Sequence, residues 1–302
     1  MSLNKILILG SEGFIGLHVI QKGIKNGYQV FGCDIVKHSN IDYNYFNISV
    51  DTNAFCTLLS EITFDCIINC AGSGNVFLSI ENPMQDFLLN VSNVFYILEA
   101  IKKYQKKTKY IHISSAAVYG NPESLPIKET SLISPISPYG FHKLQSEILC
   151  KEYAQLYGIN IFIVRPFSVY GPGLKKQIIW DTFQKGKINK IIELSGTGNE
   201  TRDFIYIDDL TDSLFHLIIS KIESFEIFNV ATGNEISIKF FLQKLLQHLG
   251  WNHKLLFNQT IREGDPKFWK ADISKLSSVG FNSKCLIDDG LSKTAKWLLN
   301  DA

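Results

Sequence analysis

The residues best suited to chemistry in this chain lie in one short segment, SPYGFHK at 137–143. Tyr139 and Lys143 are four residues apart, so both side chains would lie on one face of a helix. A phenol has a pKa of about 10 and is a weak base at neutral pH. A neighbouring ammonium favours the phenolate, which can then take a proton from an alcohol. The pair therefore predicts proton transfer to and from a substrate hydroxyl.

Ser115 is a third candidate for the same chemistry. It lies in SSAAVYG (114–120), directly after the apolar run YIHI, which predicts a strand. Ligands of parallel α/β proteins bind at the carboxyl edge of the sheet, where such a strand ends. We expect Ser115 to hold, by a hydrogen bond, the substrate oxygen that Tyr139 deprotonates.

The segment GSEGFIG (10–16) predicts a dinucleotide site. It follows the first apolar run and opens a helical pattern, which is the context that this glycine motif requires. Gly10 permits a tight turn, Gly13 lets the backbone approach a pyrophosphate, and Gly16 lets helix and strand pack closely. The helix start then offers free N–H groups to the anion. The alternative is that the glycines only close a turn.

Asp34 ends the second predicted strand, 18 residues after Gly16. A carboxylate at this position can accept hydrogen bonds from both ribose hydroxyls of an adenosine and would repel a 2′-phosphate. It therefore favours NAD over NADP. Lys37 is a nearby cation, so the preference is not fixed by the sequence alone.

Strands and helices alternate along the first two-thirds of the chain. The expected strands, mostly apolar on both faces, are 5–10, 29–34, 64–70, 109–114 and 160–166; the expected helices are 13–26, 51–61, 84–105 and 137–157. Continuous apolar strands between helices are typical of a parallel sheet covered on both sides. We therefore predict an α/β fold with a Rossmann-like, doubly wound parallel sheet.

The pattern changes after Pro166 and predicts a smaller α/β C-terminal substrate domain. We expect residues 1–171 to form the cofactor domain, joined by a returning segment at about 203–230. Residues 172–202 and 231–302 would then form the substrate domain, with helices at 177–186, 237–249 and 288–299 and a strand at 190–196.

The composition predicts a protein without a strongly charged partner. The 302 residues are 45% hydrophobic and 20% charged, with a formal net charge of +1, so we expect neither nucleic acid nor membrane binding. No run approaches the ~18 apolar residues of a membrane span. The six cysteines lack CxxC spacing, which predicts reduced thiols, a cytoplasmic location and no metal site.

Together these motifs resemble the extended short-chain dehydrogenase/reductase family, in its nucleotide-sugar epimerase/dehydratase branch. The resemblance covers nearly the whole chain and includes GSEGFIG, NCAGSGNV (69–76), SSAAVYG, SPYGFHK, RPFSVYGPG (165–173), GTGNETRDFIYIDDL (196–210) and REGD (262–265). It implies that the N-terminal domain holds NAD and that the C-terminal domain holds a nucleoside diphosphate sugar.

The resemblance also assigns roles to further positions. It implies cofactor contacts for Phe14, Ile15, Asn47, Ile48, Cys70, Ala71, Gly72, Asn90, Tyr139, Lys143 and Pro166. It implies substrate contacts for Ser115, Ser168, Arg202, Arg262 and Asp265. Two guanidiniums suit a diphosphate, although Arg202 could instead pair with Asp203 or Asp208. Ser168 and Ser195 depart from common family residues and leave the nucleotide base open.

Ala116 and Ala117 bear on the reaction. Dehydratases of this branch typically have Asp-Glu there, and decarboxylases keep a glutamate at the second position. A methyl group carries no proton, so we predict a 4-epimerase, which needs only Ser115, Tyr139, Lys143 and a retained NAD. A 4-keto-sugar reductase using NAD(P)H is the alternative, and a cofactor-binding regulator is a third reading. Relatives often dimerise through a four-helix bundle, so the resemblance also implies a homodimer.

Overall fold

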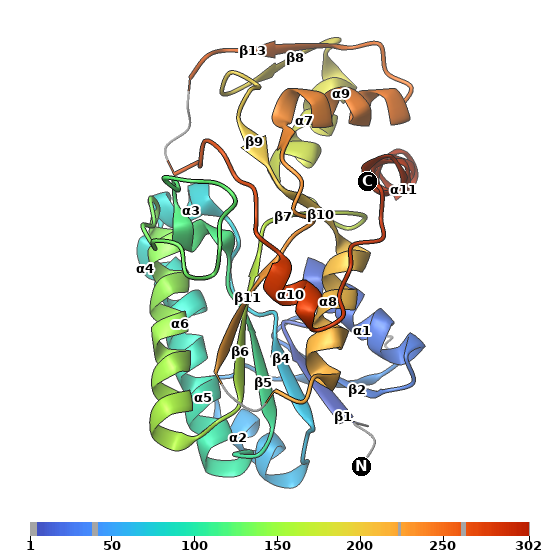
Figure 1. Ribbon diagram of the computed structural model, residues 1–302. Helices are drawn as coiled ribbons and strands as arrows, with labels where there is room; N and C mark the ends of the chain where they lie inside the picture. The colour runs from blue at the N-terminus through green and yellow to red at the C-terminus, as the bar shows by residue number, and fades with distance from the viewer. Residues whose placement is uncertain (1–4, 38–41, 223–224, 261–263, 302) are drawn as a thin grey trace.

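The computed structural model describes residues 5–37, 42–222, 225–260 and 264–301, and centres on one parallel sheet (Figure 1). Seven strands pair in the order β11-β6-β5-β4-β1-β2-β3, and all six pairings are parallel. The strands are β1 (Lys5–Leu9), β2 (Gln29–Asp34), β3 (Asn44–Asn47), β4 (Cys66–Asn69), β5 (Lys109–Ile113), β6 (Ile161–Pro166) and β11 (Glu226–Val230). The predicted α/β class and parallel sheet are confirmed.

Helices cover both faces of the sheet (Figure 1). Helices α1 (Phe14–Lys25) and α8 (Ile207–Ile219) pack on one face; α2 (Asn53–Glu61), α5 (Asn93–Tyr104) and α6 (Pro138–Tyr157) pack on the other. The sequence of β1 does not alternate between apolar and polar residues, because both faces of the strand are buried. Ile6 and Ile8 enter one core cluster while Leu7 and Leu9 enter the other, and all four are fully buried.

The order of the strands reverses between β1 and β4. The chain runs outward from β1 through β2 to β3, then returns to the other side of β1 and continues through β4, β5 and β6. Such a switch point opens a crevice at the carboxyl ends of the strands, where open α/β sheets bind ligands. The predicted glycine loop and Ser115 both follow strands at this edge.

The rest of the chain builds a smaller group of elements above this edge (Figure 1). Three two-stranded ladders are β7 (Ser168–Tyr170) with β10 (Phe204–Tyr206), β8 (Ile191–Leu194) with β13 (Lys254–Phe257), and β9 (Thr201–Arg202) with β12 (Ile236–Ser237). The helices of this group are α7 (Gln177–Ile188), α9 (Ile238–His248) and α11 (Ile287–Asp301), whereas α10 (Ser274–Ser278) contacts β11 of the main sheet. Strand β11 returns to the main sheet beside β6.

The expected helix at 84–105 is interrupted in the structure. The segment divides into α4 (Pro83–Phe87), a π-helical turn η1 (Leu88–Ser92) and α5, and α3 (Val76–Glu81) precedes them. The π turn shifts the helix register, and Asn90 within it is 1% exposed. Sequence analysis also missed β3, β13 and the 3₁₀ turn η2 (Ala116–Tyr119), which are too short for periodicity to reveal.

The lysine-rich run KKYQKKTK (102–109) covers the end of α5 and the start of β5. Within it, Lys109 Nζ donates to three carbonyl oxygens at the end of α8. All six cysteines have free thiols. Within the described ranges, no helix combines the length and apolar character needed to cross a membrane.

Candidate active site

The glycine loop lies at the switch point and requires glycine for steric reasons. Gly10 has a φ of 70°, and a Cβ there would lie 2.6 Å from the backbone nitrogen of Ala71, which follows β4. A Cβ on Gly16 would lie 2.1 Å from the carbonyl oxygen of Gly10. The loop therefore holds β1, α1 and the end of β4 in close contact, as the predicted motif requires.

The start of α1 is open to an anion. Gly13 is its N-cap, and among the described residues no side chain caps the helix. The first turn, which includes Phe14 and Ile15, carries no acidic residue, so nothing competes for its N–H groups. A Cβ on Gly13 would meet only the Gly10 carbonyl oxygen, at 3.2 Å. This open cradle fits a pyrophosphate.

The side chain of Asp34 is fixed at the end of β2. Its Oδ2 accepts from the Glu12 N–H at 3.0 Å, and its Oδ1 accepts from the Val36 N–H at 3.2 Å. Asn47 and Ile48 lie beside it, because both donate to the Asp34 carbonyl oxygen. The acidic group predicted to meet the adenosine ribose is thus held next to the glycine loop.

The segment after β4 and the π turn meet on the other side of the loop. Gly72 has a φ of 127°, and a Cβ there would lie 2.5 Å from Asn90 Oδ1. Asn90 Nδ2 donates to Asp86 Oδ1 at 3.1 Å, whereas its buried Oδ1 has no hydrogen-bond partner among the described residues. Burial raises the pKa of the Cys70 thiol to about 12, which keeps it neutral.

Ser115 and Tyr139 meet at the end of β5. Ser137 is the N-cap of α6 and accepts from the Gly140 N–H, so the helix begins beside the tyrosine. Burial raises the pKa of Tyr139 to about 12, and a hydrogen bond with Ser115 acts in the opposite direction. Ser115 Oγ also accepts from the Ala117 N–H at 3.1 Å, which leaves its own proton free to be donated to the phenol oxygen.

Lys143 is buried behind Tyr139. Its Nζ donates to the Ile113 carbonyl oxygen at 3.0 Å and lies 6.0 Å from the centre of the Tyr139 ring. Burial lowers the pKa of Lys143 to about 8, while the charges of Asp86 and Glu147 act to raise it. The structure therefore brings Ser115, Tyr139 and Lys143 together, with the carboxylates of Asp86 and Glu147 near the lysine.

Several side chains that support this group were missed in the sequence. Asp86 accepts a hydrogen bond from Asn90, and its Oδ2 atom lies 2.6 Å from the Nδ1 atom of His142. His142 is the residue before Lys143 in the chain. Glu147, one turn after Lys143, pairs with Arg165 of β6, and both are at most 4% exposed. The four-residue spacing of Asp86 and Asn90 within a helical pattern could have predicted their contact. The contacts of His142 and Glu147 could not be predicted in this way, because their partners are distant in sequence.

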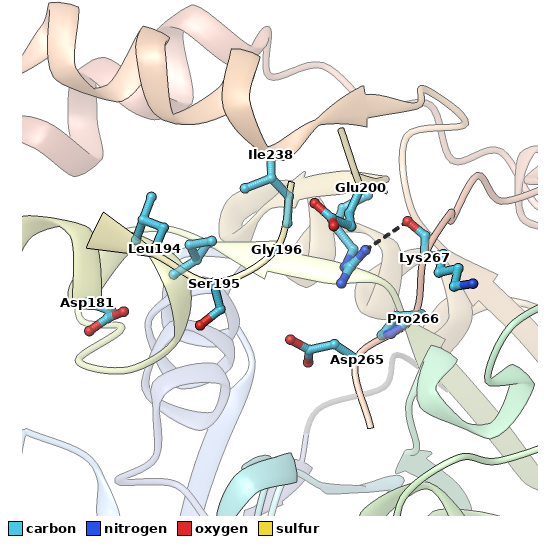
Figure 2. Close-up of a pocket in the computed structure, with 11 residues that line it drawn as sticks. Asp181, Leu194, Ser195, Gly196, Glu200, Ile238, Asp265, Pro266 and Lys267 are labelled. Atoms are coloured by element: carbon cyan, nitrogen blue, oxygen red, sulfur yellow. Dashed lines mark hydrogen bonds between the residues drawn. The ribbon is translucent and has the colours of Figure 1, made fainter. Parts of the chain in front are cut away.

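A pocket among the upper elements contains two of the predicted substrate residues (Figure 2). Arg202 and Asp265 both line it, and Figure 2 shows the carboxylate of Asp265 directed toward the side of the pocket that carries Ser195. The charges of Asp265 and Glu200 raise the pKa of Arg202, although burial lowers it overall. The lining residues are Ile178, Asp181, Leu194, Ser195, Gly196, Glu200, Arg202, Ile238, Asp265, Pro266 and Lys267.

Two other predicted positions, Ser168 and Pro166, do not line this pocket. A third, Arg262, is not among the described residues. Ser168 begins β7 and donates its N–H to the Asp203 carbonyl oxygen. Pro166 is the buried last residue of β6, opposite Val230 of β11.

The alternative pairings of Arg202 are not observed. The Asp203 carboxylate accepts from backbone N–H groups of Thr232, Gly233 and Ala271. Asp208 instead lies 3.7 Å from Lys293 Nζ. Arg202 Nη1 donates to the carbonyl oxygens of Thr201 and Lys267, which leaves the guanidinium without either of those carboxylates.

The fold and this site define a dinucleotide-binding α/β enzyme with its reacting groups at the sheet edge. The chain belongs to the NAD-dependent epimerase/dehydratase family, whose model matches residues 6–231. This confirms the predicted family and its cofactor, NAD. When bound, NAD accepts a hydride from a substrate carbon and can return it; the glycine loop, the open start of α1 and Asp34 are the residues that fit it.

Individual relatives cover nearly the whole chain. A UDP-glucuronate 4-epimerase of Thermodesulfobacterium geofontis is 29% identical, over 96% of this chain and 95% of the relative. The structure of UDP-glucuronic acid 4-epimerase from Bacillus cereus, with UDP-glucuronic acid and NAD, matches with a TM-score of 0.90 and 29% identity, covering 98% and 99% of the two chains. UDP-glucose 4-epimerase of Thermotoga maritima, with UDP-glucose, matches with a TM-score of 0.89 and 26% identity, covering 98% of each chain.

Proposed function

We propose that this chain is an NAD-dependent nucleotide-sugar 4-epimerase. The observation that carries the proposal is the composition of the reacting group. Ser115, Tyr139 and Lys143 are together, while the two positions after Ser115 are alanines; Ala116 is fully buried in an apolar cluster. Elimination of water or loss of a carboxylate needs further acid–base groups, whereas epimerisation at a carbinol carbon does not.

Each of the three residues takes a defined part in this reaction. Tyr139 removes the proton from the sugar C4 hydroxyl as the hydride leaves the same carbon, giving a 4-keto sugar. Ser115 donates its single hydroxyl proton in a hydrogen bond to the substrate C4 oxygen once the sugar is bound, in place of the Tyr139 oxygen. Lys143 supplies positive charge behind the ring, and rotation of the 4-keto sugar exposes its other face for the return of the hydride.

The substrate we propose is a nucleoside diphosphate sugar, with a uridine nucleotide as the first candidate. Arg202 and Asp265 supply a cation for a phosphate and an acceptor for a base N–H. The relatives from B. cereus and T. maritima bind UDP-glucuronic acid and UDP-glucose respectively. We also propose that the predicted substrate segments, 172–202 and 231–302, hold this nucleotide above the NAD-binding part formed by 1–171 and about 203–230.

The experiment that tests the function omits added cofactor. The purified protein is incubated separately with UDP-glucose, UDP-N-acetylglucosamine and UDP-glucuronate, and the C4 epimers are followed by NMR. An epimerase that retains NAD interconverts at least one pair. No interconversion of any of the sugars contradicts the proposal. Stoichiometric consumption of NADH with a 4-keto sugar would instead establish the reductase alternative.

We further propose a homodimer formed through α5 and α6. In 84–101 the buried apolar residues are Val91, Val94, Ile97, Leu98, Ala100 and Ile101, whereas the exposed ones are Met84, Phe87, Leu88, Phe95 and Tyr96. They continue on α6 through the exposed Phe141 and Ile148. An apolar face of this kind suits a second copy of the same face. Light scattering tests the homodimer, because the Phe95→Glu variant is expected to be monomeric.

We also propose a cytoplasmic location, which the free cysteines support.

A further inference from the structure

The ammonium of Lys176 lies beside the loop that follows β4, and no role has been assigned to it so far. Lys176 is the residue before α7, at the end of the link from β7. Its Nζ atom lies 3.3 Å from the position that a Cβ would take at Gly74. Gly74 is two residues after Gly72, which contacts Asn90. The lysine therefore reaches from the upper elements to the segment that borders the predicted NAD site.

The same ammonium faces the reacting group without a partner of its own. Its positive charge contributes to lowering the pKa of Lys143, so the two ammonium groups lie near one another. The side chain of Lys176 is itself exposed to solvent. The described residues provide it with no hydrogen bond and no ion pair. The exposed ammonium is therefore available to an anionic group of a ligand at this point, with which it would form a charge-assisted hydrogen bond.

The backbone next to Lys176 has an unusual conformation. Gln177 has a φ of 65°, a left-handed conformation that residues other than glycine rarely adopt. The neighbouring Lys175 is directed elsewhere, with its Nζ 5.9 Å from the centre of the Trp180 ring. The strained residue thus lies at the point where the chain turns into α7, with one lysine beside Gly74 and the other at an aromatic side chain.

The position of Lys176 along α7 indicates which part of a ligand it would meet. Ile178 and Asp181, further along this helix, line the pocket that contains Arg202. Lys176 precedes them, on the side of Gly74 and Lys143. A nucleotide sugar with its nucleotide in the pocket and its sugar at Tyr139 would place the sugar beside Lys176. Neutral sugar hydroxyls need no ammonium, whereas a sugar carboxylate does.

We propose that Lys176 binds the carboxylate of a nucleotide-linked uronic acid, so that this chain prefers a nucleoside diphosphate uronate to the neutral hexose. The inference rests on the proposed epimerase function and adds the substrate class to it. Lys176 acts on specificity alone: it forms one charge-assisted hydrogen bond with a group remote from C4 and takes no part in proton transfer.

The test compares two substrates in three variants of the holoenzyme. We expect Lys176→Met to lower kcat/KM for UDP-glucuronate by about 10- to 100-fold, the effect of one charge-assisted hydrogen bond. The value for UDP-glucose should change by less than about threefold. Lys176→Arg should retain most of the activity on the uronate, and Lys175→Met is the matched control that should alter neither substrate.

The possible outcomes separate this inference from the proposed function. Equal losses with both substrates would assign Lys176 to the diphosphate and overturn the proposal, as would no loss with the uronate. If the wild type turns over neither UDP-glucuronate nor UDP-glucose, calorimetric binding of these two nucleotides tests the Lys176 inference instead. The epimerase proposal itself fails only if UDP-N-acetylglucosamine is not interconverted either. The Lys176 inference is supported if UDP-glucuronate binds more tightly than UDP-glucose and if Lys176→Met abolishes this difference. Equal binding of the two nucleotides, or no binding of either, overturns the inference.

Discussion

The Nδ1 atom of His142 lies 2.6 Å from the Oδ2 atom of Asp86, directly behind the predicted reacting group. Asp86 is 3% exposed and also accepts from Asn90. Its charge raises the pKa of both Lys143 and Tyr139. The buried carboxylate thus acts on the proton equilibria of the lysine and the tyrosine, while His142 and Asn90 hold it in place.

Asp86→Asn is expected to move the pH profile of activity to lower pH. Lys143 must be protonated to favour the Tyr139 phenolate, so activity is lost as pH rises through its pKa, about 8 before cofactor binds. Removal of the Asp86 charge lowers that pKa and moves the alkaline limb down by about one pH unit. The same charge raises the pKa of Tyr139, so its removal lowers that pKa as well.

Initial rates between pH 5 and 10, with enough substrate to measure both kcat and kcat/KM, check this shift. His142→Asn is the control, because it keeps the Asp86 charge and removes only the imidazole; we expect its limbs to move less. Unchanged limbs in Asp86→Asn would show that the carboxylate does not control the ionisation of Lys143.

Tyr139→Phe is expected to lower the turnover number at least about a thousandfold, because it deletes the group that accepts the proton. The fold should remain, since the ring stays buried and the backbone N–H of Tyr139 still donates to Ser79 Oγ. NAD that co-purifies with the protein, measured by absorbance after denaturation, should be unchanged. Tyr157→Phe, in the same helix, is the control and should be fully active. An active Tyr139→Phe variant would refute the assigned role.

Two glycines of the cofactor loop should respond differently to alanine. Gly16→Ala places a Cβ 2.1 Å from a backbone oxygen, so β1 and α1 must separate, at a cost of about 3 kcal/mol in stability. Gly13→Ala meets only one oxygen at 3.2 Å, so we expect a stable fold with at least tenfold weaker NAD binding, roughly 1.4 kcal/mol.

Urea denaturation and calorimetric titration with NAD of the stripped proteins separate the two effects. A Gly13→Ala protein that binds NAD normally would show that the cofactor does not approach the loop at this residue. A Gly16→Ala protein of normal stability would contradict the close packing.

Glu147→Gln is expected to destabilise the fold. The carboxylate accepts from Arg165 Nε at 2.9 Å and Nη2 at 2.6 Å, and both residues are almost completely buried. Its removal leaves a buried guanidinium without a counter-charge, which costs about 3–5 kcal/mol. Glu152→Gln, at an exposed position of the same helix, should change stability by less than about 0.5 kcal/mol. Urea denaturation of both variants decides whether the buried pair has this effect.

Much of the fold was predictable because its signals are local. The strands buried on both faces appear as continuous apolar runs, and the glycine loop lies between the first strand and helix where its motif requires it. The π turn was not predictable, because residues 84–105 follow a helical pattern throughout. Strand β3 has a half-exposed pattern over four residues, too short for a period of two to be recognised.

The sequence by itself determined the residue types that could react and the elements that carry them: Tyr139 and Lys143 on one helix face, and Gly10 and Gly16 in one turn. Local spacing is enough for that, because a helix or a turn fixes neighbours in the chain. Only the tertiary structure decided which distant residues surround them. His142 meets Asp86, and Lys176 reaches Gly74, because α6 packs beside α4 and the upper elements return over the sheet edge.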